Sequence, residues 1–237
     1  MKKMRLDKFL ATYTTLSRKE AKRSIRQGEI QVDGETVLEG EKKISPCQHI
    51  CMRGQRIEAK EHIYIMMNKS AGVLSATRDK NDTTVVECVE CGGHELFPVG
   101  RLDKDTEGFL LLTDDGKLAH RLLSPAYHVP KTYYFTYEGE LVENAAELVA
   151  EGIDIGGGVR TKAGILRLLE TGTAELTIEE GKYHQVKRMI AALGGRVTYL
   201  KRISMAGLAL DDNLRPGEYR ELTEDELAVL TESANRS

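Results

Sequence analysis

The chain has 237 residues, with 34 Lys or Arg, 37 Asp or Glu and a formal charge of −3 at pH 7. Hydrophobic residues make up 41% and charged residues 30%, which is typical of a soluble globular protein. No apolar run approaches the roughly 18 residues of a membrane-spanning helix. The basic start of the chain has no long apolar run behind it, which argues against a signal peptide and for a cytoplasmic protein.

Charge is divided unevenly along the chain. Residues 1–61 carry a net charge of +5, and the remaining residues carry −8. This asymmetry suggests a basic module joined to a larger body. Such a module can bind nucleic acid through the phosphates, although a solvated surface helix explains the same charges.

Two helices are predicted near the start. Residues 5–14 repeat apolar side chains at helical spacing. Ser17 and Glu20 have the spacing of a capping box, so a second helix should follow Ser17 and run to about Gln27. Its cations are Arg18, Lys19, Lys22, Arg23 and Arg26.

A β-hairpin should follow the two helices. Asp33 and Gly34 lie between alternating residues, which is a strong hairpin signal. The hairpin and the helices would form one compact unit, ending at the polar residues 58–61. We therefore expect one domain over residues 1–60 and a second over residues 61–237.

In the second part, strands and helices do not alternate regularly. Strands are expected near residues 63–67, 109–113, 131–138, 163–169, 173–179, 196–203 and 218–222. Helices are expected near residues 83–89, 115–123, 144–152 and 184–193, and from a second capping box at Thr223 onward. This order favours an α+β fold with a central, mostly antiparallel sheet.

The loop before the strand at 109–113 contains a candidate catalytic carboxylate. Asp103 stands between two cations in the sequence, Arg101 and Lys104. Rigid structure beside a loop positions catalytic groups, and opposite charges would hold Asp103 ionised as a nucleophile or base requires. An ordinary polar turn has the same composition, so the residues alone leave both interpretations open.

A second candidate lies in residues 180–189. On a helix, His184, Lys187 and Arg188 share one face, which could bind phosphate or pair with a carboxylate. A solvated basic face explains the pattern equally well. In the strand at 131–138, Tyr133 and its neighbour point to opposite faces, so one of them can be core and the other can stack on a base.

The four cysteines do not form a recognisable metal motif. Cys47 and Cys51 are separated by three residues, and Cys88 and Cys91 by two. A Cys-x2-Cys pair is half of a zinc site, but the two pairs fall in different expected domains, so we expect partly buried thiols and no metal. A metal-binding regulatory protein remains an alternative.

Residues 100–116 carry the clearest resemblance. Gly100-Arg101-Leu102-Asp103, continued by Asp105-Thr106-x-Gly108 and the apolar strand up to Gly116, resembles the catalytic signature of bacterial ribosomal RNA pseudouridine synthases. Residues 4–50 resemble the S4-type RNA-binding domain found at the front of these enzymes. Residues 62 to about 230 resemble their α+β catalytic domain. Ser70 departs from the family, which usually has Pro there, but no chemical group is lost.

The resemblance also points to a subgroup. Residues 180–189 are similar to the small-subunit (16S) enzymes of the RsuA type, because large-subunit relatives usually carry Asn-Arg where this chain has Tyr183-His184. The implied reaction is the isomerisation of one uridine of 16S rRNA, conventionally position 516, to pseudouridine. Nothing is added or lost, so no cofactor is required. The implied partner is 16S rRNA or an immature small subunit, and a monomer is the simplest expectation.

The resemblance assigns roles residue by residue. Asp103 matches the essential aspartate, Tyr133 the active-site tyrosine, and Lys187 the cation that pairs with the aspartate; Val186 matches the apolar residue beside that cation. The residues expected to contact RNA are Arg101, Arg18, Lys19, Lys22, Arg23, Arg26, His184 and Arg188. Two alternatives stay open: the same reaction on a 23S rRNA uridine, and a non-catalytic RNA-binding ribosome-assembly factor.

Overall fold

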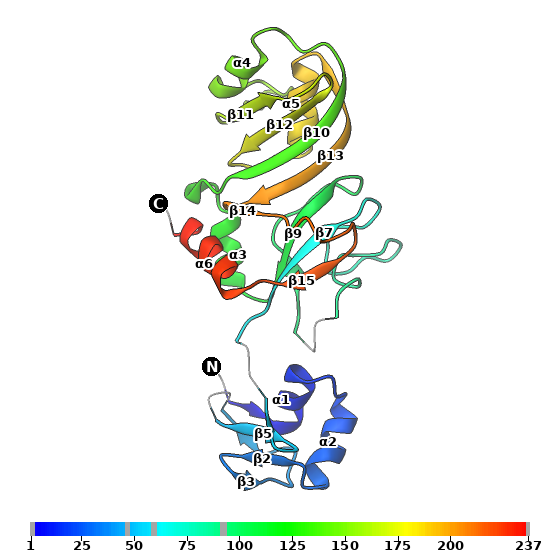
Figure 1. Ribbon diagram of the computed structural model, residues 1–237, viewed down its shortest axis with the longest axis vertical. Coiled ribbons are helices and arrows are strands. Elements are labelled where there is room, and N and C mark those ends of the chain that lie inside the picture. Colours follow the sequence, from blue (N-terminus) through cyan, green and yellow to red (C-terminus); the bar gives the residue numbers. More distant parts are fainter. Residues whose placement is uncertain (1–2, 46–47, 58–60, 91–93, 236–237) are drawn as a thin grey trace. The chain divides into compact units, whose positions relative to one another are not determined.

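The computed structural model describes residues 3–45, 48–57, 61–90 and 94–235 (Figure 1). The chain divides into two compact units. The N-terminal unit comprises Met1–Ile63 with Glu90–Glu95, and the C-terminal unit comprises Tyr64–Val89 with Leu96–Ser237. The division expected between residues 60 and 61 stays a prediction. Within the described ranges, no helix is long and apolar enough to cross a membrane.

The N-terminal unit contains the two predicted helices and the predicted hairpin. Its helices are α1 (Leu6–Tyr13) and α2 (Arg18–Arg26), and its strands are β1 (Met4–Arg5), β2 (Ile30–Val32), β3 (Glu35–Thr36), β4 (Lys43–Ile44), β5 (Ile50–Met52) and β6 (Gln55–Arg56). Ser17 and Glu20 form the complete capping box at the start of α2. Apolar side chains of both helices and of the sheet β3-β2-β5-β6 are buried together and form the core of this unit.

One buried charge in this unit attracts part of the basic helix α2. Asp7 is fully buried and accepts hydrogen bonds from the Arg5 guanidinium at 3.0 and 2.8 Å. Arg18 and Lys22 of α2 lie 3.6 and 3.8 Å from the same carboxylate. Burial alone raises the pKa of Asp7, but the bonds and charges of these cations outweigh it and leave the pKa below its ordinary value.

The C-terminal unit is built on one nine-stranded sheet. Its order is β11-β12-β10-β13-β9-β7-β15, with β14 on β13 and β8 on β9. The strands are β7 (Tyr64–Lys69), β8 (Phe97–Pro98), β9 (Glu107–Thr113), β10 (Lys131–Gly139), β11 (Ile165–Leu168), β12 (Thr173–Ile178), β13 (Gly195–Met205), β14 (Leu208–Ala209) and β15 (Tyr219–Glu221). Neighbours are antiparallel except β13 and β9, which are parallel. The expected α+β fold with a mostly antiparallel sheet is confirmed.

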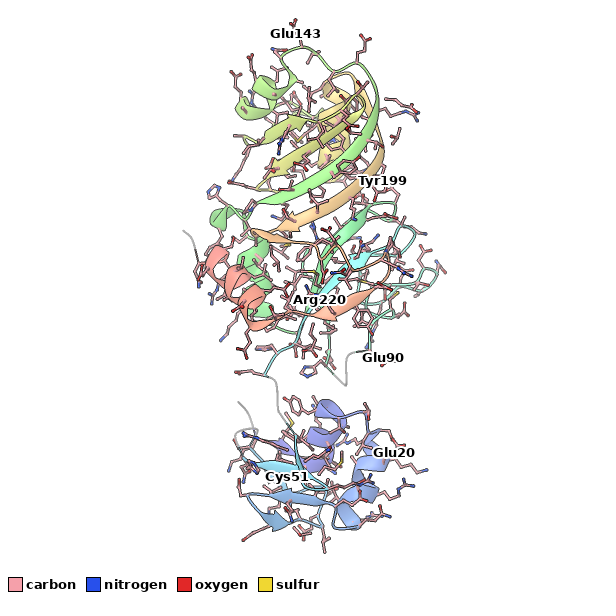
Figure 2. All side chains as sticks on the ribbon, in the orientation of Figure 1. Glu20, Cys51, Glu90, Glu143, Tyr199 and Arg220 are labelled. Atoms are coloured by element: carbon pink, nitrogen blue, oxygen red, sulfur yellow. The ribbon has the colours of Figure 1, made fainter. Side chains whose placement is uncertain are left out.

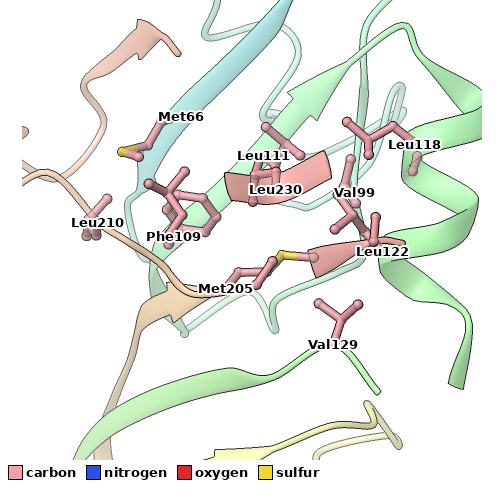
Figure 3. Close-up of a cluster of buried hydrophobic side chains, with 14 residues drawn as sticks. Met66, Val99, Phe109, Leu111, Leu118, Leu122, Val129, Met205, Leu210 and Leu230 are labelled. Carbon is pink, nitrogen blue, oxygen red and sulfur yellow. The ribbon is translucent and has the colours of Figure 1, made fainter. Parts of the chain in front are cut away.

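Helices cover this sheet in two places (Figure 1). The helices are α3 (Gly116–Leu123), the 3-10 turn η1 (Pro125–Tyr127), α4 (Ala145–Glu151), α5 (Gln185–Ala192) and α6 (Glu224–Ser233). α5 packs on β13 and α4 on β11, whereas α3 and α6 pack against each other. At that end, Phe109, Met205 and Leu230 are fully buried in one apolar cluster (Figure 3).

The helix predicted at residues 83–89 is wrong. This segment forms turns, and Thr84 makes an isolated bridge to Leu74. The Glu87 carboxylate accepts bonds from the backbone amide and the hydroxyl of Thr84, which closes a turn. Two Thr followed by two Val are poor helix formers because β-branching restricts their side chains against the preceding turn.

The parallel junction between β9 and β13 requires a glycine. Gly108 pairs with Arg202 and has φ +100°. A Cβ at this position would lie closer than 3.0 Å to both the backbone oxygen and the backbone nitrogen of Arg202. Glycine therefore allows the two strands to meet, and the loop of residues 100–106 enters the sheet at this seam.

Candidate active site

A pocket that is open to solvent lies beside the parallel junction. The loop before β9 contributes Arg101, Leu102, Asp103 and Thr106 to its wall. Strands β10, β12 and β13 contribute Tyr133, Ile178 and Leu200. The remaining wall is formed by the segment that enters α5: Gly181, Lys182, His184, Gln185, Val186 and Lys187. Five of the predicted site residues thus line one pocket: Arg101, Asp103, Tyr133, His184 and Lys187.

One ammonium group is shared by two carboxylates at the mouth. The Nζ atom of Lys187 lies 3.3 Å from Oδ2 of Asp103. It is closer to Asp105, at 2.6 and 2.9 Å from the two carboxylate oxygens. Burial lowers the pKa of Lys187, but the bond to Asp105 and the charge of Asp103 reverse the effect, so its pKa is raised. The bond to Lys187 also lowers the pKa of Asp105.

The imidazole of His184 approaches Asp103 from another direction. Its Nε2 atom lies 3.6 Å from Oδ1 of Asp103. The sequence analysis places His184 within the helix, but it is the residue before α5 and has left-handed backbone angles, φ 49° and ψ 37°. Its ring stacks on Tyr183, with centroids 3.8 Å apart and planes inclined by 20°.

Tyr133 forms the apolar wall of the pocket. β10 alternates, so that Lys131, Tyr133 and Phe135 are buried on one face of the sheet. Tyr134 points to the other face and meets Tyr199 edge to face at 6.4 Å; Tyr199 is labelled in Figure 2. One of the two adjacent tyrosines is therefore core, as expected, but the other is half-buried rather than exposed.

The cations beside Asp103 in the sequence are not its partners in the structure. Lys104 forms an ion pair with Asp82 at 2.7 Å. Arg101 is exposed and lines the pocket. Consecutive side chains of an extended loop diverge, so the cation nearest to Asp103 comes instead from α5, as Lys187.

Known proteins resemble the chain over nearly its whole length. Residues 63–192 match the family described as RNA pseudouridylate synthase, and residues 4–50 match the S4 domain. The chain belongs to the RNA pseudouridylate synthase family. The predicted fold and reaction class are thereby confirmed.

Individual relatives cover the synthase from end to end. It is 48% identical to the uncharacterized RNA pseudouridine synthase YtzG of Bacillus subtilis, over 97% of this chain and 99% of the relative. It is 42% identical to the ribosomal small subunit pseudouridine synthase A of Escherichia coli K12, over 95% and 99%. A crystal structure of a pseudouridylate synthase has a TM-score of 0.68 and 39% identity, over 96% of this chain and 99% of the other.

A buried lysine supports the loop that carries the two carboxylates of the synthase. Lys69, at the end of β7, is fully buried and donates to the carbonyls of Ser70, Lys104 and Thr106 at 3.0, 3.3 and 2.8 Å. Burial lowers its pKa to about 8, although Asp105 and other nearby carboxylates oppose the shift. Lys69 was not expected at the site, because a lysine after an apolar strand is usually exposed. Asp105 belongs to the signature but had no predicted role.

A second buried polar group supports the segment before α5. The Glu180 carboxylate accepts from the backbone amide of Lys162 at 2.9 Å and from Nε2 of Gln185 at 2.8 Å, and pairs with Lys182. Arg188, expected to contact RNA, donates to the carbonyls of Ile155, Gly156 and Tyr183. Its guanidinium therefore holds two loops of the synthase together.

The remaining RNA candidates lie on α2 of the N-terminal unit. Arg18, Lys19, Lys22, Arg23 and Arg26 are all exposed. A groove lined by Ser17, Lys19, Glu20, Lys22, Arg23 and Arg26 runs along this helix. Arg18 and Lys22 lie near Asp7, and the charge of Arg23 acts on Glu20 and Glu29, so part of the helix's positive charge is compensated within this unit.

Two of the four cysteines lie in the described ranges. Cys51 and Cys88 are free and partly buried, whereas Cys47 and Cys91 lie outside the described residues. Cys88 belongs to a turn rather than to the expected helix. In the described part of the chain, no group of three or more His, Cys, Asp or Glu could hold a metal ion.

Proposed function

We propose that this synthase converts one uridine of 16S rRNA, at position 516, to pseudouridine, with Asp103 as the catalytic residue. The observation that carries the proposal is the convergence of Asp103, Lys187 and buried Tyr133 in one pocket. The small-subunit substrate is supported by the 42% identity to the Escherichia coli enzyme named for it and by the Tyr183-His184 pair.

The substrate uridine must leave the RNA stack to react, because its N1–C1′ bond is hidden within it. Tyr133 is only 8% exposed and presents its ring to the pocket, where it would stack on the flipped uracil. Arg101, exposed beside the same pocket, would brace the space that the base leaves in the RNA. The pocket wall would keep the detached uracil close to C1′.

The reaction is an isomerisation and needs no external group. The N1–C1′ bond breaks, the uracil turns, and C5 bonds to C1′; C5 loses a hydrogen and N1 gains one. Asp103 starts this sequence either by attack on C1′ or by removing a ribose proton. Both routes require an ionised carboxylate with open access, and the Asp103 side chain is 28% exposed.

Lys187 would pair with Asp103, and Asp105 would hold Lys187 in place. The shorter contacts of Lys187 are to Asp105, so this second carboxylate keeps the ammonium protonated and in place. The Asp105 side chain is 73% exposed and that of Asp103 is 28% exposed, so Asp103 is the more enclosed of the two carboxylates that contact Lys187.

RNA binding would be shared between the two units. The cations of α2 would contact phosphates, which orient the RNA without reading its sequence. The pocket of the C-terminal unit would select the uridine. The setting we propose is the bacterial cytoplasm, where the synthase would act as a monomer on 16S rRNA or an immature small subunit.

The test is to map pseudouridine after incubation of the protein with unmodified 16S and 23S transcripts and immature small subunits. Asp103→Asn keeps the shape of the side chain and should lose turnover but retain RNA binding. Asp82→Asn is the matched control, because it alters the neighbouring Lys104 pair without reaching Lys187. It should remain active.

Each outcome decides one part of the proposal. A single new pseudouridine in 16S RNA, absent with Asp103→Asn and present with Asp82→Asn, would support both substrate and residue. Modification of 23S RNA alone would refute the substrate. Binding without modification of any RNA would refute the enzymatic assignment and favour the assembly-factor alternative, and turnover by Asp103→Asn would refute the role of that residue.

A further inference from the structure

Tyr183 is an exposed aromatic residue beside the pocket. Tyr183 is 77% exposed, the highest value for any large apolar side chain in the described part of the chain. One face of its ring stacks on His184 at a centroid distance of 3.8 Å. The other face of the ring is open to solvent, and an exposed aromatic face of this kind is a surface on which an RNA base can stack.

The position of this ring places it beside the pocket but outside it. Gly181, Lys182 and His184 line the pocket, whereas Tyr183 between them does not. Two contacts in series link the ring to the catalytic carboxylate: Tyr183 to His184 at 3.8 Å, and His184 Nε2 to Asp103 at 3.6 Å. The ring is thus a neighbour of the reacting nucleotide's site.

The exposure of Tyr183 is built into the fold. Glu180 is only 8% exposed, and its bonds fix the turn on which Tyr183 stands. Arg188 donates to the Tyr183 carbonyl at 3.3 Å. The left-handed backbone of His184, uncommon for a residue with a side chain, turns the two rings face to face. The platform is therefore ordered before any ligand arrives.

We infer that Tyr183 is a stacking platform for an unpaired base of the substrate RNA, next to the uridine that enters the pocket. This inference rests on the proposed function. Flipping a nucleotide removes a stacking partner from each of its neighbours, and an exposed aromatic ring can replace one of them. Tyr133 is buried within the pocket and would receive the flipped base, so the free face of Tyr183 remains for a neighbouring base.

The absence of tryptophan from the chain allows a direct test. In an Asp103→Asn background, Tyr183→Trp introduces a single indole at the platform. Its emission is followed during titration with a 16S hairpin transcript that contains position 516, and binding is measured in parallel by filter retention. Ile165→Trp, on β11 and 69% exposed, is the control for a surface indole away from the pocket.

We expect quenching of the Tyr183→Trp emission that saturates with filter retention, and none for Ile165→Trp. Replacing the nucleotides beside position 516 one at a time by abasic ribose should abolish the quenching for one of them. Stacking of one base is worth about 1–3 kcal/mol, so Tyr183→Ala in the otherwise unaltered chain should weaken RNA binding by about 5- to 150-fold. The loss should fall on KM more than on kcat, and Tyr183→Phe should restore affinity.

RNA retention without a change in the emission of the Tyr183→Trp protein would overturn the inference, as would quenching that no abasic substitution removes. Failure of the proposed function is visible separately, as absence of pseudouridine in 16S RNA treated with the unaltered chain. Quenching together with that failure would leave the platform standing and refute only the activity.

Discussion

The parallel seam between β9 and β13 gives the strongest prediction for a single substitution. Gly108→Ala places a Cβ closer than 3.0 Å to two backbone atoms of Arg202. Backbone atoms paired in a sheet cannot rotate out of the way as the end of a side chain could. It also forces an alanine to adopt φ +100°, which costs about 1–3 kcal/mol. The clash must open the pairing of Gly108 with Arg202 and of Glu107 with Lys201.

We expect a total loss of about 3–5 kcal/mol, since the backbone displacement adds to the conformational cost. For a domain of this size each kcal/mol lowers Tm by about 2–4 °C, so the expected fall is about 6–20 °C. The loop that carries Asp103 enters the sheet at this glycine, and a displacement of about 1 Å there can cost on the order of 100-fold in turnover. Urea titration, calorimetry and pseudouridine formation measure the three effects.

Two other glycines separate the contributions. Gly72 has φ +89°, and no atom lies within 4 Å of the point that a Cβ would occupy, so Gly72→Ala should cost only the conformational part, about 1–3 kcal/mol. Gly116 begins α3, with no positive φ and open space around it, so Gly116→Ala should be neutral or stabilising by up to about 1 kcal/mol. A Gly108→Ala protein as stable and active as Gly72→Ala would refute the steric argument.

Three further outcomes follow from the charges. Asp105→Asn removes a carboxylate that raises the pKa of Lys187, so the alkaline limb of the kcat profile should move to lower pH; an unmoved limb would contradict the role of Asp105. Burial raises the pKa of Asp7, but the neighbouring guanidinium groups lower it by more, so the pKa in the folded protein is below the ordinary value. The ionised Asp7 therefore stabilises the fold above about pH 4, and this stabilisation is lost as the pH falls through the folded pKa. Urea titration should therefore show Asp7→Asn destabilised at pH 7 and nearly equal to the unaltered protein below that pKa. Arg23→Gln with Arg26→Gln should reduce the slope of log affinity against log salt by about 1.4 for single-stranded RNA, and an unchanged slope would remove α2 from the interface.

Local chemistry made most elements of the fold predictable. The capping boxes at Ser17 and Thr223 start α2 and α6 as expected, because each cap satisfies backbone amides within one turn. The hairpin at Asp33 follows from residues that tolerate left-handed backbone angles. The helix expected at 83–89 does not form, because its β-branched residues oppose it and the Glu87 carboxylate closes a turn instead.

The resemblance named Asp103, Tyr133 and Lys187, which line one pocket, and their roles stay predictions; most contacts within the site could not be read from the sequence. The pairing of Asp103 with Lys187 was expected, yet proximity in the sequence suggested Lys104, which bonds Asp82 instead. Asp105 and Lys69 were not expected at the site. The role of Asp105 becomes visible only from its contact with the Lys187 ammonium, and that of Lys69 only from its bonds to three loop carbonyls.

The sequence by itself determined the family and most of the helices and strands, because these depend on a long motif and on short-range patterns. Only the tertiary structure decided which charges meet. The parallel pairing of β9 with β13 brings the loop of Asp103 to the segment that enters α5, and the bonds of the buried Glu180 hold that segment. Electrostatic and stacking contacts fall off within a few ångströms, so their partners are set by the folded chain and cannot be read from distance along it.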